Sequence, residues 1–541
     1  MRIGSYRSGV ALLALIFVAW SAVAATTKAT TTSAEAATER YFQSIRKDPR
    51  LLLVFLREMP KGGDLHNHLT GSVYAESFIP WAAEAGDCVD SKTTALSPGP
   101  CAPPLRPVSD AFADQALYNQ MIDAFSMRNW QYSGQSGHDH FFDTFGKYWQ
   151  AWQGKDDKLL ADSAEQAAAN HVLYQELMMS LTGKDLDDLA KSWGEKLGWD
   201  DDFGHQRPAQ DSDFRRMQNE LMAGGLPAML TVASQNLHKD EERRDLLLGC
   251  GTPQARPGCE VEQRFLEQVA RGKPKAVVFG EILAGFLMAG GDSSLAVPHV
   301  VSLNLVMAED WYVPMTDFSL HMQMLDYLHR RYPNVHVTLH AGELVMGLVP
   351  PEDLRFHIRE SVELGHAERI GHGVDIMNEK DPQQLLREMA DRKAMVEICL
   401  TSNDVILGVS GKQHPLSQYI QAGVPVALAT DDEGVARSDM THEYLRGAQD
   451  QELSYLQLKK MARTSLEHAF LPGTSLWREG NDFVVVKQCA GDVPGGKLSP
   501  SCQKWLKDSE KARLQWKLEE QFREFEAQPR SVPAAAPEKK Q

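Results

Sequence analysis

The chain has 541 residues, a net charge of −17, and 43% hydrophobic and 24% charged residues. It is longer than one ordinary domain, and its composition is that of a globular protein with a large buried core. The acidic balance and the lack of a basic stripe argue against a nucleic-acid-binding surface.

The N-terminus has the pattern of a secretory signal peptide. Arg2 and Arg7 precede an apolar run over residues 10–20, and an A-x-A cleavage site ends at Ala24, before Ala25. The apolar run is too short to span a membrane, which needs roughly 20 residues. We therefore expect a secreted or periplasmic protein with no membrane span after processing.

The spacing of the cysteines is consistent with export of the protein. Cys399 lies in an apolar run and is expected to be a buried free thiol. The other six form local pairs around loops rich in proline or glycine, as short disulfide-closed loops do in an oxidising compartment. The sequence leaves the connectivity open, and we expect the local pairing: Cys88 with Cys101, Cys250 with Cys259, and Cys489 with Cys502.

Short apolar runs alternate with helical patterns along the chain, and most of these runs end in polar residues. Eight such runs predict a closed TIM (β/α)8 barrel. A doubly wound open sheet is the alternative, but neither a G-x-G-x-x-G nor a P-loop fingerprint supports it. The expected strands cover residues 59–69, 171–178, 227–233, 276–282, 335–343, 369–373, 394–403 and 425–432.

The barrel is expected to carry additions. The connection after strand 1 is too long for a simple βα unit, and an insertion at this place usually shapes the substrate entrance or an interface. Residues 26–38, rich in alanine and threonine, are expected to be disordered. The predicted segments are a signal peptide (1–24), an N-terminal leader and helix (25–55), the barrel (56–435) with a disulfide-bearing insertion (about 86–136), a helical C-terminal extension (436–528) and a disordered tail (529–541).

Polar residues at the strand ends predict a metal site at the barrel mouth. His66 and His68 stand at i and i+2 of the first strand, so their side chains share one face. His340 and Asp431 end two later strands, and strand ends converge at the mouth of a barrel. Three imidazoles and a carboxylate suit zinc and leave a position for water. These four residues are therefore the predicted ligands of one Zn²⁺.

Two other histidine groups are expected not to bind metal. His336 lies about 13 Å deeper than His340 at a strand rise of roughly 3.3 Å per residue, so we expect it in the buried interior. His138 and His140 lie in a helical context, where residues two apart do not face each other.

Five motifs occur in order within residues 56–470. They are Asp64-Leu65-His66-Asn67-His68-Leu69-Thr70-Gly71, His340-Ala341-Gly342-Glu343, Arg369-Ile370-Gly371-His372-Gly373, Thr401-Ser402-Asn403 and Thr430-Asp431-Asp432. Together they resemble the motifs of the adenosine/AMP deaminase group of the zinc amidohydrolase superfamily. Secretion, the insertion and the Met59-Pro60-Lys61-Gly62 lead-in are most similar to the secreted growth-factor-type adenosine deaminases and their bacterial relatives.

The resemblance implies hydrolytic deamination of adenosine, and of 2′-deoxyadenosine, to inosine and ammonia. Asp431 would bind zinc and take the water proton, and His372 would orient the hydroxide that attacks C6 of the purine. Glu343 would be protonated and give its proton to N1. Substrate contacts are implied for Asp432 at N7, for a backbone N–H at or near Gly285 at N3, and for His68.

Thr70, Leu400 and Glu433 depart from the family pattern, and this leaves the recognition of the sugar open. A deaminase of adenine or of a modified purine nucleoside, a zinc hydrolase of amides or esters, and a non-catalytic extracellular nucleoside-binding protein are the alternatives. Glu343 and His372 favour an enzyme, because binding alone needs no proton donor beside a hydrolytic metal. The insertion and the helical C-terminus are candidate contact surfaces of a dimer.

Overall fold

The computed structural model describes residues 33–199, 202–205, 208–478 and 483–530. The predicted signal peptide, its cleavage site and most of the predicted tail lie outside the described residues. Helix α1 (Ser33–Ile45) begins at Ser33, so the disorder predicted for residues 26–38 is wrong from Ser33 onward. Among the described helices, none combines the length and apolar character that a membrane span requires.

The core is a closed barrel of parallel strands. The strands form two four-stranded sheets, in the orders β1-β5-β6-β7 and β11-β10-β9-β8. One seam is closed by the Asp431 N–H, which donates to the His66 carbonyl at 2.8 Å, and by the His68 N–H, which donates to the Asp431 carbonyl at 3.1 Å. At the other seam, the His340 N–H donates to Asn304 Oδ1 at 2.9 Å. The predicted (β/α)8 barrel is confirmed, with strands β1 (Gly62–His68), β5 (Val172–Met179), β6 (Glu262–Ala270), β7 (Val300–Val306), β8 (Thr338–Ala341), β9 (Arg369–His372), β10 (Met395–Ile398) and β11 (Val426–Leu428).

Two of the eight predicted strands are wrong. Residues 227–233 lie in helix α10 (Leu226–Leu248), and residues 276–282 lie in helix α11 (Lys275–Phe286). Every residue of α11 is buried, so this helix has no exposed polar face, and its mostly apolar sequence cannot be told from a buried strand by its pattern. The strands in their place are β6 and β7. Strand β6 was missed because it carries polar residues that line the barrel interior.

The outer layer of helices covers the strands. Helix α20 packs across the β1–β11 seam, and the Ser465 hydroxyl accepts the Gly63 N–H at 2.8 Å. Gly62 adopts φ +73°, and a Cβ there would lie 2.2 Å from the Ala462 carbonyl oxygen, so glycine permits this close packing. The helices that follow the barrel strands include α7 (Asp156–Ala169), α8 (Lys184–Leu197), α9 (Asp211–Ala223), α13 (Phe318–Arg331), α14 (His357–Glu363), α15 (Pro382–Arg392), α16 (Leu400–Leu407), α17 (Leu416–Ala422), α18 (Glu433–Ala436), α19 (Met440–Gln449) and α20 (Tyr455–His468).

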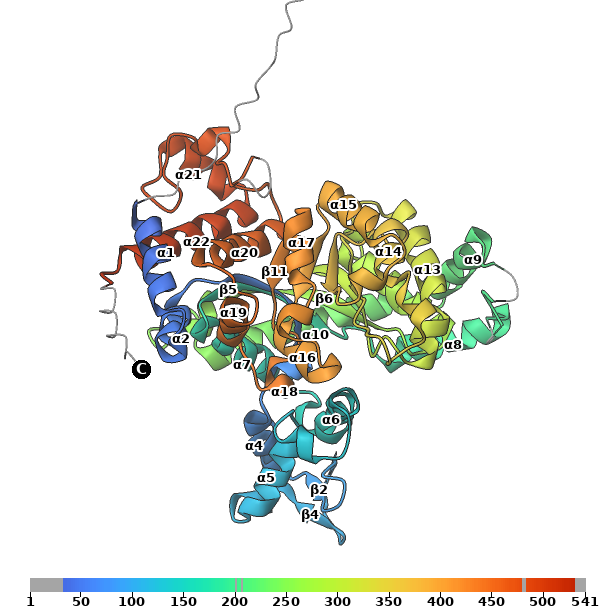
Figure 1. The fold of residues 1–541 in the computed structure, drawn as a ribbon. Helices are drawn as coiled ribbons and strands as arrows, with labels where there is room; N and C mark the ends of the chain where they lie inside the picture. The colour runs from blue at the N-terminus through green and yellow to red at the C-terminus, as the bar shows by residue number, and fades with distance from the viewer. Residues whose placement is uncertain (1–32, 200–201, 206–207, 479–482, 531–541) are drawn as a thin grey trace, which may run out of the picture.

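The insertion after β1 forms a lobe that projects from the barrel, drawn in blue and cyan in Figure 1. Its small antiparallel sheet has the strand order β3-β2-β4. Helix α6, which ends the lobe, returns the chain to the barrel mouth. The lobe contains α3 (Leu69–Ser72), α4 (Ala75–Ala85), β2 (Cys88–Asp90), β3 (Leu96–Ser97), β4 (Leu105–Pro107), α5 (Gln115–Ala124) and α6 (Gly137–Trp152).

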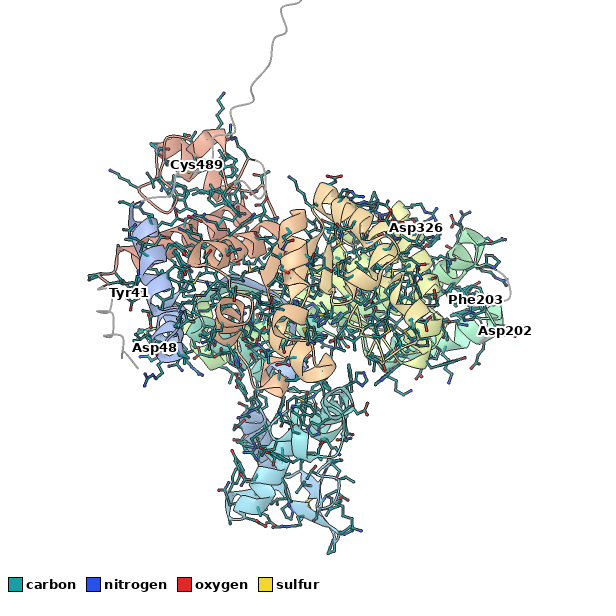
Figure 2. All side chains as sticks on the ribbon, in the orientation of Figure 1. Tyr41, Asp48, Asp202, Phe203, Asp326 and Cys489 are labelled. Carbon is teal, nitrogen blue, oxygen red and sulfur yellow. A yellow bond between two sulfur atoms is a disulfide. The ribbon has the colours of Figure 1, made fainter. Side chains whose placement is uncertain are left out.

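The first and last helices of the described chain lie together beside the barrel. Helix α22 (Glu510–Ala527) packs between α1 and α20, and α2 (Pro49–Glu58) lies near α1 (Figure 1). Phe55 and Phe525 make an edge contact with ring centroids 5.0 Å apart. Helix α21 (Pro500–Lys507) completes the C-terminal lobe, where Cys489 is labelled in Figure 2.

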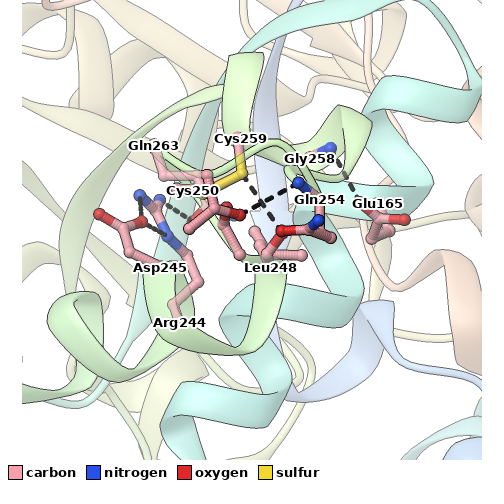
Figure 3. Close-up of a disulfide and its surroundings, with 11 residues drawn as sticks. Glu165, Arg244, Asp245, Leu248, Cys250, Gln254, Gly258, Cys259 and Gln263 are labelled. Carbon is pink, nitrogen blue, oxygen red and sulfur yellow. Dashed lines mark hydrogen bonds and ion pairs between the residues drawn. A yellow bond between two sulfur atoms is a disulfide. The ribbon is translucent and has the colours of Figure 1, made fainter.

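The three predicted disulfides are confirmed. The bonds join Cys88 to Cys101, Cys250 to Cys259, and Cys489 to Cys502, and Cys399 is a buried free thiol. The Cys250–Cys259 bond closes the loop between α10 and β6, and the Gly258 N–H donates to Glu165 on α7 at 2.8 Å (Figure 3). Each bond therefore fixes a local loop at the edge of the fold.

Candidate active site

Four side chains converge at the barrel mouth with the spacing of a tetrahedral metal site. His340 Nε2 lies 3.0 Å from His66 Nε2 and 3.2 Å from His68 Nε2. Asp431 Oδ1 lies 3.4 Å from each of the two β1 nitrogens. Ligands about 2.1 Å from a zinc ion at tetrahedral angles are about 3.4 Å apart, so the observed spacings fit zinc. The four predicted ligands are brought together.

Hydrogen bonds to the other ring nitrogens orient these imidazoles. His66 Nδ1 donates to Glu397 on β10 at 2.6 Å, and His340 Nδ1 donates to Asn304 on β7 at 2.8 Å. His68 Nδ1 has a longer contact of 3.5 Å with Gln268 on β6. A proton on Nδ1 leaves the Nε2 lone pair directed at the common centre, as a metal ligand requires.

The protonation states of these four side chains also favour the binding of a cation. Burial lowers the pKa of His68 to about 4 and that of His340 well below its usual value, so both rings are neutral. Burial disfavours a charge on His66 too, but its bonds to Asp431 and Glu397 outweigh this and raise its pKa to about 10. Burial would raise the pKa of Asp431, but its ion pair with His66 lowers it below its usual range. A metal bound here would therefore replace a proton on His66.

Glu343 follows β8 and is held as a protonated acid beside this centre. Burial, together with the charges of Asp431 and Glu309, raises its pKa to about 8. Its backbone N–H donates to Glu309 Oε2 at 2.9 Å, while Glu343 Oε1 is buried and has no hydrogen-bond partner among the described residues. A buried acid with an unpartnered oxygen has the form of a proton donor for a ligand.

His372 presents an N–H to the same space. Asn403 Nδ2 lies 3.0 Å from His372 Nδ1, and Asn403 Oδ1 lies 3.0 Å from His414 Nε2. The Leu416 N–H donates to His414 Nδ1 at 3.2 Å, so His414 donates through Nε2 and Asn403 donates through its amide. His372 Nδ1 is thus an acceptor and Nε2 carries the proton, and Nε2 has no partner among the described residues.

Asp432 approaches the mouth because residue 71 is glycine. A Cβ on Gly71 would lie 1.6 Å from Asp432 Oδ1, so any larger residue would displace this carboxyl group. Burial and the neighbouring charge of Asp431 raise the pKa of Asp432 well above its usual value. Asp432 Oδ1 is also buried without a partner among the described residues.

A cavity of about 340 Å³ opens onto all these groups. Its outer wall is aromatic, and most of that wall comes from α6, the helix that ends the insertion. No Lys or Arg is among the described residues that line it. The lining consists of His68, Thr70, Phe141, Phe142, Phe145, Tyr148, Trp149, Trp152, Gln268, Val306, Met307, Trp311, His340, Glu343, His372, Asp431 and Asp432.

The predicted contact of Gly285 with the substrate is wrong. Gly285 lies in α11, where an added Cβ would meet Leu303 at 2.9 Å and Glu267 at 3.4 Å, so it packs behind β6 and β7. The error follows from taking this helix for a strand. Instead, Val306 and Met307 at the end of β7 line the cavity, and Met307 adopts the unusual φ of +82°.

The histidines set apart from the metal site have other roles. His138 and His140 diverge as predicted: His138 contacts Asp310 at 2.9 Å, and His140 contacts the Ser126 carbonyl at 3.1 Å. His336 is not in the buried interior, because its side chain is 48% exposed and contacts Glu368 at 2.7 Å. Strand β8 begins only at Thr338, so His336 lies outside the barrel wall.

The residues that orient the site were not predicted from the sequence. Glu397 was hidden within an apolar run, although a lone carboxylate in a buried strand is a usable signal because it needs a partner. Asn403 was recognised as part of a motif but without a role. Nothing in the local sequence marks Asn304 or His414, since each finds its partner only across the fold.

The fold and the site define the class of protein: a TIM barrel whose mouth carries three histidines and an aspartate that could hold a metal ion. Residues 293–476 match the adenosine deaminase family model, which confirms the resemblance for the four motifs that lie in this range. The adenosine deaminase of Klebsiella pneumoniae is 41% identical over 137 residues, which are 25% of this chain and 38% of that protein. The chain thus spans under half the length of this relative.

Solved structures of similar fold include two deaminases. An adenine deaminase from Arthrobacter aurescens has a TM-score of 0.43 and 16% identity, and the match covers 76% of this chain and 94% of that one. The N6-methyl-AMP deaminase from Arabidopsis thaliana has a TM-score of 0.46 and 18% identity, with 78% and 94% covered.

Proposed function

We propose that the protein is a zinc-dependent deaminase that hydrolyses adenosine, and 2′-deoxyadenosine, to inosine and ammonia. The observation that carries the proposal is the set of three buried polar atoms, on Glu343, His372 and Asp432, that face one cavity beside the four ligands and lack partners among the described residues. Buried polar atoms are normally paired, so this set is best explained by a polar ligand.

The donor set fits zinc, and His66, His68, His340 and Asp431 would hold it. When bound, zinc lowers the pKa of a bound water to about 7 and so supplies hydroxide at neutral pH. The His372 Nε2–H would donate to the attacking oxygen and align it with C6. Glu343 would protonate N1, which allows the ring to accept the electron pair before ammonia leaves. Asp432, protonated because of burial, would donate to N7.

The cavity favours an uncharged substrate. Its wall of aromatic rings from α6 can stack on a purine, but the described lining offers no cation to a phosphate group. Thr70 and Gln268 are the neutral polar groups available to a sugar. This supports a nucleoside over a nucleotide such as AMP. We also propose, from the sequence, that the mature protein is secreted or periplasmic and that a dimer is its candidate assembly.

The decisive experiment follows the loss of adenosine absorbance in the ultraviolet with purified mature protein, before and after dialysis against a chelator and again after zinc is restored. We expect turnover that the chelator removes and zinc restores. Adenine, 2′-deoxyadenosine and AMP are tested in parallel. Turnover of adenine alone would support the proposed deamination but show that adenine, and not adenosine, is the substrate. Zinc binding without turnover of any purine would overturn the proposal.

A further inference from the structure

Glu309 follows the end of β7 and lies behind the turn that carries Glu343. Its side chain is fully buried, and each carboxylate oxygen accepts a backbone N–H of that turn, Oε1 from Gly342 at 3.1 Å and Oε2 from Glu343 at 2.9 Å. Oε1 also accepts from Nδ1 of His357, at the start of α14, at 2.5 Å. One carboxylate therefore joins the loop after β7 to the loop after β8 and to α14.

The turn after β8 has the backbone shape that this contact requires. Gly342 adopts φ +74°, and consecutive N–H groups of a turn that passes through the left-handed region can converge on one anion. A Cβ at residue 342 would lie 2.5 Å from Asp375 Oδ1 and 2.7 Å from Ile358 Cδ1, so a larger residue does not fit. The direction of the Glu343 N–H is thus set by the contact with Glu309.

Glu309 binds the turn as an anion. Burial disfavours its charge, but His357 and Arg271 outweigh this and lower the pKa of Glu309 to about 2. Hydrogen bonds to a charged acceptor are stronger than those to a neutral one. Arg271 is itself buried and donates to the carbonyls of His340, at 3.2 Å, and of Met307, at 2.8 and 2.9 Å. Arg271 therefore holds the end of β8, and Glu309 holds the turn that follows it.

The carboxyl group of Glu343 lacks comparable support. Its Oε1 is buried without a partner among the described residues, and it lies 3.7 Å from His372 Nδ1, which is too far for a hydrogen bond. A group that transfers a proton must be held within about 0.5 Å of its working position. The backbone contacts of this turn consequently decide where the carboxyl group lies.

We propose that Glu309 is a positioning residue, which holds the two N–H groups of the turn and so places the Glu343 carboxyl group where it protonates N1 of the purine. The inference rests on the proposed deamination. Glu309 is not among the described residues that line the cavity, so it acts through Glu343 and not on the substrate. A misplacement of roughly 1 Å can cost about a hundredfold in rate, and this sets the scale of the effect.

The variant that tests the contact is Glu309→Gln. An amide has one acceptor oxygen, so at least one N–H of the turn loses its acceptor. The matched control is Glu379→Gln, because Glu379 is also buried but accepts the N–H groups of Ile358 and Arg359, at 2.7 and 3.1 Å, through Oε1 alone. We expect kcat to fall at least about tenfold in E309Q, with KM and zinc content near wild type, and to stay within about twofold in E379Q.

A double-mutant cycle separates positioning from general damage to the fold. If Glu309 acts through Glu343, the loss caused by E309Q should shrink to less than about twofold when Glu343 is already glutamine, because the group that Glu309 positions is then gone. A variant that only weakened the fold would lower the residual activity of E343Q by the same factor as that of the wild type. Equal factors in the two backgrounds would overturn the proposal.

Hydrogen–deuterium exchange provides a readout that needs no turnover. In the zinc-loaded protein, the peptide that covers residues 339–346 should exchange faster in E309Q than in the wild type, because an amide without its acceptor opens more readily, and should be unchanged in E379Q. Unchanged exchange in E309Q would overturn the inference whatever the activity. Wild-type protein that turns over no purine would instead overturn the proposed function, on which the catalytic part of the inference rests.

A second pair of variants tests the same contact with Glu309 left in place. His357→Leu removes the donor to Oε1, whereas His357→Asn places an amide N–H near the position of Nδ1. We expect kcat to fall further in H357L than in H357N at equal zinc content. This pair decides the question if E309Q does not fold, and equal kcat values in the two variants would overturn the proposal.

Discussion

Asn403 donates a hydrogen bond to Nδ1 of His372 at 3.0 Å, and this single contact determines which nitrogen of His372 carries the proton. The amide is itself oriented by His414, whose tautomer is set by the Leu416 backbone N–H. A backbone group of α17 thus controls an N–H at the barrel mouth through two side chains.

Asn403→Asp should reverse this arrangement. A carboxylate accepts from His372 Nδ1, so the proton would leave Nε2 and the ring would lose its donor toward the nucleophile. We expect kcat to fall roughly a hundredfold or more, with zinc content and KM nearly unchanged. Asn334→Asp, at an exposed position, is the matched control. Steady-state kinetics together with metal analysis tests this prediction. An equal loss of kcat in both variants would contradict the assigned tautomer of His372.

Glu343→Gln should remove the proton donor but leave the metal. We expect kcat/KM to fall by about 10² to 10⁴, the usual contribution of a general acid, while the protein still binds zinc. In the wild type, burial raises the pKa of Glu343 to about 8, so the acid form that the reaction needs is present below that pH and is lost above it. The pH profile of kcat/KM should therefore decline on its alkaline side through about pH 8, and an alkaline limb that persists unchanged in the glutamine variant would contradict this assignment.

Glu397→Gln should weaken metal binding without removing a ligand. Glu397 accepts the proton of His66 Nδ1 at 2.6 Å and so orients its Nε2. Outer carboxylates of this kind are worth about 10- to 100-fold in metal affinity. Competition with a chromogenic chelator measures the zinc Kd directly. Glu352→Gln, at a side chain that is 82% exposed, is the control and should retain wild-type affinity.

Gly71→Ala should impair catalysis through Asp432. The new Cβ would fall 1.6 Å from Asp432 Oδ1, so the carboxyl group must rotate away from the purine. We expect at least a tenfold loss of kcat/KM, as for a lost hydrogen bond to a polar substrate atom, at roughly wild-type zinc content. Gly146→Ala on α6 has open space around its Cβ and should keep full activity, with a gain of about 0.5–1 kcal/mol in stability.

Lys61→Met should destabilise the fold. The ammonium group of Lys61 is fully buried and donates to the carbonyls of Leu56 at 2.7 Å and of Met59 and Asn170 at 2.9 Å. Methionine fills a similar volume but leaves these acceptors unpaired, at about 1–3 kcal/mol each. Urea unfolding should show a loss of at least about 3 kcal/mol, whereas the exposed Lys380→Met should change little. A stability loss below 1 kcal/mol would show that water replaces the lysine.

The sequence alone predicted which four side chains meet at the barrel mouth, because strand geometry brings His66 and His68 to one face and the strand ends of a barrel converge on His340 and Asp431. It also determined the local disulfides, since each closes a short loop. The sequence pattern did not identify β6 and β7 as strands. A helix buried on all sides, such as α11, shows no amphipathic period, and a strand that lines a polar interior, such as β6, does not look apolar.

Only the tertiary structure decided how the site is oriented and what surrounds it. The contacts of His66 with Glu397, of His340 with Asn304, and of His372 with Asn403 join different strands and helices of the barrel. Most of the aromatic wall comes from α6, the last helix of the insertion, which lies far from β1 along the chain. Such partners lie far apart in sequence, and no local period encodes them. They are paired in the folded chain because a buried polar group without a hydrogen-bond partner costs free energy.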